Sequence, residues 1–133
     1  MSEVPLPAGY VDPTDAAAVA EVVAATVSTG GLDAVSDLLA RLPGTRVTPE
    51  VRKGLLRPAA PAAVWLGTES CWSRTEPPTL LHVVNGVVLH REEVEPGEAP
   101  GLLGRVVVDL VRRTGAVGDA SAVLTAAREL ADG

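Results

Sequence analysis

The dipeptide Asn85-Gly86 separates two segments, 79–84 and 87–92, that are rich in valine and leucine. Asn-Gly between such segments is the strongest short-range signal for a β-hairpin, because the favoured two-residue turn needs a positive φ at both central positions. A turn of this kind also sets the pairing register of the two strands. The sequence therefore predicts an antiparallel hairpin that the rest of the chain has to cover.

A regular register predicts which side chains of this hairpin lie opposite each other. The expected pairs are Val84 with Val87, Val83 with Val88, His82 with Leu89, Leu81 with His90, and Leu80 with Arg91. Since side chains alternate between faces, His82 and His90 are expected on opposite faces, which argues against a two-histidine site. Both faces are apolar near the turn, which indicates cover on both sides, from helices or from another subunit.

Five segments have the apolar spacing or the capping signals of helices. The first is expected to begin at Pro13 with Asp12 as its N-cap and to stop at Gly30-Gly31. The others cover about 32–42, 49–57 (after the N-cap Thr48), 101–114 and 119–131. One further strand is expected over 62–73, with a bulge at Gly67. Residues 1–11 are interpreted as an extended arm.

The predicted order ααα-βββ-αα separates helices from strands. This order favours an α+β fold in which helices pack on a three-stranded antiparallel β-meander. At 133 residues the chain is long enough for one hydrophobic core, so residues 12–133 are expected to form a single domain.

Charge and cysteine content narrow the function classes. The net charge of −6 weighs against nucleic-acid binding. A single cysteine excludes an intrachain disulfide and fits a reducing compartment. The N-terminus lacks the pattern of a signal peptide and no uncharged apolar run is long enough for a membrane span, so we expect a soluble cytoplasmic protein. The scarcity of lysine and aromatic residues is typical of a GC-rich bacterial genome.

No catalytic, nucleotide-binding or metal-binding motif stands out, so no catalytic residue, cofactor or metal is predicted, and an enzyme is the less favoured class. The leading hypothesis is a non-enzymatic assembly module, a homodimer or a binder of another protein, with interface candidates Val83, Val88, Leu81 and His90. The alternative is a small-molecule-binding protein or small enzyme with a pocket between sheet and helices, lined by His82, Arg91, Glu69, Cys71 and Trp65. A weaker alternative is a DNA-binding regulator that uses the helix 49–57 and the basic patch Arg46, Arg52, Lys53 and Arg57.

Overall fold

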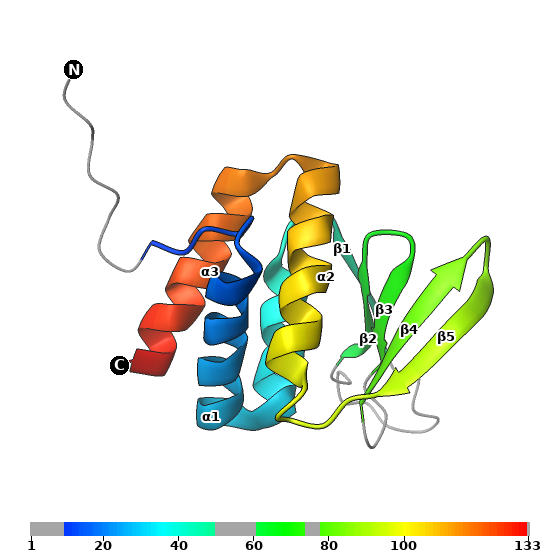
Figure 1. Cartoon of the computed structure of the whole chain (residues 1–133), viewed down its shortest axis with the longest axis horizontal. Coiled ribbons are helices and arrows are strands. Elements are labelled where there is room, and N and C mark those ends of the chain that lie inside the picture. Colours follow the sequence, from blue (N-terminus) through cyan, green and yellow to red (C-terminus); the bar gives the residue numbers. More distant parts are fainter. Residues whose placement is uncertain (1–9, 50–60, 74–77, 133) are drawn as a thin grey trace.

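The computed structural model describes residues 10–49, 61–73 and 78–132. Its elements are α1 (Ala16–Arg41), β1 (Thr45–Pro49), β2 (Pro61–Leu66), β3 (Ser70–Ser73), β4 (Thr79–Val84), β5 (Val87–Glu93), α2 (Ala99–Thr114) and α3 (Val117–Asp132). The strands form one antiparallel five-stranded sheet in chain order, and the helices gather beside it (Figure 1). The predicted α+β class with an antiparallel sheet is confirmed, whereas the three-stranded meander and the order ααα-βββ-αα are wrong.

The two extra strands arise at a glycine and a proline that suit more than one local structure. Gly67 has a φ of 81° and turns the chain, so the single strand expected over 62–73 is the hairpin of β2 and β3. Thr48 and Pro49 lie in β1 rather than at a helix start. Because β1 is an edge strand, the missing N–H of Pro49 is tolerated there. The remainder of the helix expected over 49–57 lies outside the described residues.

Gly31 divides α1 into the two helices that the sequence predicts. Its φ of 69° and ψ of −167° are not helical, so the segments 16–30 and 32–41 run in different directions. The first segment begins later than predicted. Its N-cap is Asp15, which accepts the N–H of Ala17 at 3.0 Å, while Asp12 instead accepts the N–H of Thr14 at 2.9 Å.

The core lies between the helices and the near half of the sheet. Trp72 is fully buried at its centre, and its indole N–H donates to the hydroxyl of Ser36 on α1 at 2.9 Å. Val64 and Leu66 face the same way from β2. The helices contact mainly β1 and β2, so the hairpin of β4 and β5 projects beyond them (Figure 1).

The segment before α1 is attached to the last helix. Val11 is buried, its N–H donates to the hydroxyl of Thr125, and its carbonyl accepts the hydroxyl of Ser121 at 2.8 Å. Residues 1–9 of the predicted arm lie outside the described part of the chain.

One helix, α1, is long and apolar enough to cross a membrane by length and composition alone. Its buried residues, among them Val19, Val23 and Leu39, belong to the common core with α2 and α3. Because Gly31 also breaks the helix, we interpret α1 as a core element of a small globular fold.

The hairpin has the predicted turn but not the predicted register. Asn85 and Gly86 have φ values of 53° and 78°, and Val84 pairs with Val87 as expected. Beyond the pair of Val83 and Val88 the register shifts, and His82 lies opposite His90. One residue of β5, Leu89, is therefore extra, which is the definition of a β-bulge. The prediction that the two histidines lie on opposite faces is wrong.

Candidate interaction surface

The residues predicted to line one pocket lie on both faces of the sheet. Trp65, Cys71, Leu81 and Arg91 are successive partners across β2 to β5, so they share one face. His82 is offset by one residue from Leu81 and lies on the other face. Glu69 lies in the turn before β3 and pairs with Arg113 of α2 at 3.4 Å. The fold does not bring this set together around His82.

Cys71 has the surroundings of an unreactive thiol. Its side chain is 3% exposed, and burial raises its pKa, although the positive charge of Arg46 works in the opposite direction. A higher pKa keeps the thiol protonated, and the thiolate is the nucleophilic form. Cys71 therefore acts as a small buried hydrophobic residue in the outer face of the sheet.

A shallow cavity borders this outer face near the hairpin turn. The guanidinium of Arg46 lies over the indole of Trp65 at 5.6 Å, a cation–π contact. The cavity has a volume of about 320 Å³ and is lined by Gly44, Arg46, Trp65, Gly67, Thr68, Val83 and Gly86. Arg46 is thus engaged with Trp65, and the other members of the predicted basic patch, Arg52, Lys53 and Arg57, lie outside the described residues.

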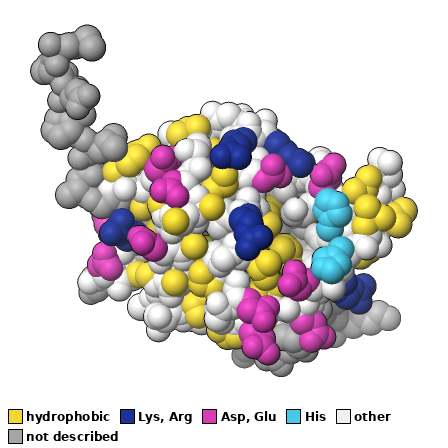
Figure 2. Space-filling model, in the orientation of Figure 1, with side chains coloured by type: hydrophobic (Ala, Val, Ile, Leu, Met, Phe, Trp, Pro, Cys, Tyr) yellow, Lys and Arg dark blue, Asp and Glu magenta, His cyan; other side chains and the backbone are white. Residues whose placement is uncertain are grey.

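The edge strand β5 carries the largest exposed apolar group near the turn. Val87, Val88 and Leu89 are 58%, 44% and 61% exposed. They follow one another in the chain and lie at the end of the hairpin that projects from the helices, where Figure 2 shows hydrophobic side chains at the rim of the molecule. Within the described residues nothing covers these three side chains. The cover that the sequence predicts for both faces of the hairpin is therefore not supplied by the described part of the chain.

The four interface candidates from the sequence occupy different environments. Val88 and His90 are exposed on β5, whereas Leu81 is half-buried and Val83 is only 6% exposed on β4. The exposed apolar surface is therefore shifted from β4 to β5. Val87 and Leu89 also belong to it, and the sequence does not predict this because a hairpin pattern does not reveal which strand is the edge.

Among the described residues, no further strand lies beside the backbone of β5. Residues that flank a two-residue turn form a hydrogen-bonded pair, so the next pair, Val83 with Val88, does not exchange hydrogen bonds. The N–H of Val83 indeed donates toward β3, to the carbonyl of Glu69 at 2.7 Å. By the same alternation, the N–H and C=O of Val88 are expected to point outward from the sheet edge. A further strand could form hydrogen bonds with them there.

The other face of the hairpin presents the two histidines side by side. Ser70, His82 and His90 are successive partners across β3, β4 and β5. Both imidazoles are exposed and adjoin at the surface, shown in cyan in Figure 2. The described residues contain no group of three or more metal-ligating side chains.

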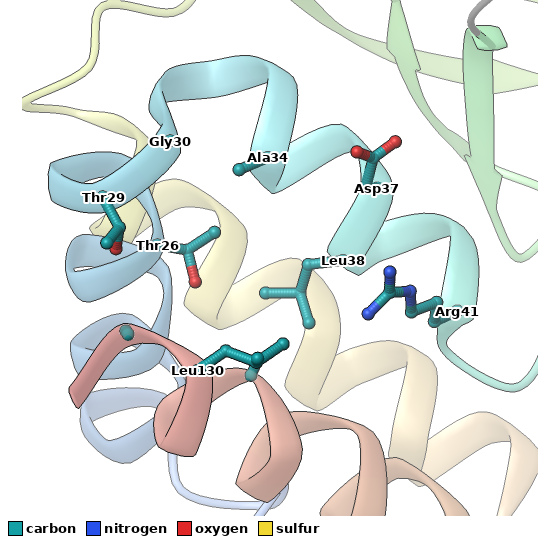
Figure 3. Close-up of a pocket in the computed structure, with 10 residues that line it drawn as sticks. Thr26, Thr29, Gly30, Ala34, Asp37, Leu38, Arg41 and Leu130 are labelled. Carbon is teal, nitrogen blue, oxygen red and sulfur yellow. The ribbon is translucent and has the colours of Figure 1, made fainter. Parts of the chain in front are cut away.

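A second cavity lies between the two segments of α1 and the end of α3 (Figure 3). Its walls include Leu38 and Leu130, the guanidinium of Arg41 lies toward Leu38, and the carboxylate of Asp37 points away. The volume of about 230 Å³ is below the range of roughly 300–1,000 Å³ that is usual for ligand pockets. This cavity is therefore a poor candidate for a ligand pocket.

The chain matches no protein-family model, and no curated protein and no solved structure is significantly similar to it.

Proposed function

We propose that this protein is a non-enzymatic assembly module that forms a homodimer by pairing two copies of β5. The observation that supports this proposal most is the edge strand β5, which no described residue covers and on which Val87, Val88 and Leu89 are all exposed. Native sheets normally protect such an edge with charge, proline or a covering segment, because it is a template for strand addition. An open apolar edge at the tip of a projecting hairpin therefore favours a partner strand.

The sequence of β5 is suited to pair with β5 of a second copy of the chain. In a two-fold symmetric antiparallel pair, a strand has to be complementary to itself. With the axis at Val88, this residue faces the partner subunit's Val88, and Val87 faces the partner subunit's Leu89. Apolar side chains then meet apolar side chains, and the outward N–H and C=O of Val88 exchange two hydrogen bonds across the axis.

Charge limits the pairing to the turn-proximal half of β5. Arg91, Glu92 and Glu93 follow the apolar residues toward the far end of the strand. A dimer centred on Val88 places these charged ends on opposite sides of the axis, at and beyond the turn of the other copy. A register centred farther along would oppose charged and apolar side chains, which costs the desolvation of each charge.

The cytoplasm is the proposed location of this dimer. The only cysteine of the chain is Cys71, which is buried and needs no oxidising compartment. A test is fractionation of the cells that produce the protein. Recovery of the protein outside the cytoplasmic fraction would contradict the assignment.

The decisive test is the mass of the protein in solution, measured by light scattering and analytical ultracentrifugation. Protein concentrations of about 1 to 100 μM cover dimers with dissociation constants in the micromolar range. The wild-type chain is expected at twice its 13.6 kDa. Val88→Lys places a charge at the two-fold axis and is expected to give the monomer. Leu130→Lys, which changes an exposed leucine on α3, is the matched control and is expected to stay dimeric.

Two results would contradict the proposal. One is a wild-type chain that remains at 13.6 kDa at every concentration. The other is a Val88→Lys chain that dimerises as well as wild type, because the axis would then lie elsewhere.

A further inference from the structure

We propose that His82 and His90 form a binding site for one divalent transition-metal ion, of the class of Cu²⁺ or Zn²⁺. The pair stands directly opposite across β4 and β5. Side chains in such pairs have their Cβ atoms about 4.5–5.5 Å apart, a spacing from which two imidazoles can turn toward a common ion. Neutral imidazole is the commonest metal ligand in proteins, and it suits copper, zinc and nickel.

The bulge at Leu89 is what creates the pair. Without this extra residue, Leu89 would face His82 and His90 would lie on the other side of the sheet. Bulges re-aim side chains and are often found next to functional sites. The irregularity in β5 thus has a chemical consequence, since it brings the only two histidines of the chain to one face.

Both imidazoles are available to an ion. Each is exposed, and neither has a hydrogen-bond or ion-pair partner within residues 10–49, 61–73 and 78–132. Ser70, the third member of the row, is too small to cover them. Within the described residues no other group therefore competes with an ion for the imidazole nitrogens.

The surrounding charge favours a cation. Glu92 lies two residues beyond His90 on β5, hence on the same face, and it is partly buried. The whole chain carries a net charge of −6. Two protein ligands leave the remaining coordination positions to water, so the site is expected to be weak and exchangeable, unlike the closed four-ligand sites of structural zinc.

The metal preference follows from the ligand type. Nitrogen ligands bind divalent first-row ions in an order that peaks at Cu²⁺, so Cu²⁺ is expected to bind more tightly than Zn²⁺. Mg²⁺ and Ca²⁺ prefer oxygen ligands and are expected not to compete. An ion held by both imidazoles would cross-link β4 to β5 beside the apolar edge and raise the melting temperature of the protein.

The test is titration of the untagged full chain with Cu²⁺ and with Zn²⁺ by isothermal calorimetry, together with thermal unfolding in each metal. Wild type is expected to bind one ion per chain. His82→Ala and His90→Ala are each expected to weaken binding at least tenfold and to abolish the rise in melting temperature. Ser70→Ala, the matched control in the same row, is expected to bind as wild type does. Far-ultraviolet circular dichroism shows whether the variants, which change exposed side chains, keep the fold.

Three results would overturn the proposal. Wild type could show no saturable binding of either metal, either histidine variant could bind as tightly as wild type, or Mg²⁺ could displace Cu²⁺. The site does not depend on the proposed dimer, and light scattering of the same samples distinguishes the two. A wild-type chain that dimerises but binds neither metal would refute the metal site alone.

Discussion

Gly104 is the position at which the packing of the helices can be tested most directly. A Cβ atom added there would lie 2.8 Å from the carbonyl oxygen of Ala16 and 3.4 Å from the Cβ of Ala20. Real Cβ atoms do not approach a backbone oxygen so closely, so α2 would have to move away from α1. Separating two well-packed elements in this way costs about 1–3 kcal/mol.

Gly101 supplies the matched control because it lies on the same helix with nothing within 4 Å of an added Cβ. Gly→Ala in a helix gains up to about 1 kcal/mol from backbone propensity, and less near the first turn. Gly101→Ala is therefore expected to be neutral or slightly stabilising, and Gly104→Ala to be destabilising despite the same gain. Their difference isolates the steric term.

The assay is thermal unfolding followed by circular dichroism, supported by urea unfolding. About 1–3 kcal/mol corresponds to roughly 4–12 °C in melting temperature for a domain of this size. Gly104→Ala should unfold below Gly101→Ala by a difference in that range. Equal melting temperatures for the two variants would refute the close contact between α1 and α2.

Three further predictions concern two buried residues, Ser36 on α1 and Cys71 on β3. Ser36→Ala leaves the buried indole N–H of Trp72 without its acceptor and should cost about 1–3 kcal/mol in urea unfolding; an unchanged midpoint would contradict the hydrogen bond. Cys71 should react with a thiol reagent only on unfolding. Burial raises the pKa of the Cys71 thiol in the folded state. The stability that the protonated thiol contributes is therefore complete below the pKa of an unfolded thiol and is lost as the pH rises through the folded pKa. Urea unfolding between about pH 7 and 11, a range that spans the ordinary thiol pKa, measures this loss.

Local signals predicted the parts of this fold that depend on neighbouring residues. Asn85-Gly86 predicted the turn, and Gly30-Gly31 predicted the break at Gly31. Two signals were ambiguous because the same residues suit different structures. Thr48-Pro49 fits a helix start and also an edge strand, and Gly67 fits a bulge and also a turn. Tertiary pairing decided in favour of a strand at Thr48-Pro49 and of a turn at Gly67.

The candidate sites were harder to predict because they depend on register over several strands. The apolar residues of β5 were visible in the sequence, but their exposure depends on β5 being an edge that no described helix covers. The histidine pair depends on one extra residue, Leu89, and nothing in the local sequence marks it as a bulge. A shift of one residue reverses every face assignment beyond it, so the regular register separated two side chains that the fold places together.

The same bulge also limits where a partner strand can pair. Beyond Leu89, the extra residue has shifted the alternation of outward N–H and C=O groups, so the regular edge is limited to the turn-proximal end of β5. The charged residues that follow then discourage longer pairing, which is how natural sheets avoid uncontrolled growth from an edge. A short apolar edge that ends at a bulge suits a closed two-fold dimer rather than an extended fibre, because the described part of each copy offers one such edge, which the dimer uses once. The bulge thus separates the two proposed surfaces along β5, with the backbone edge at Val88 for a second copy and the face at His90 for an ion.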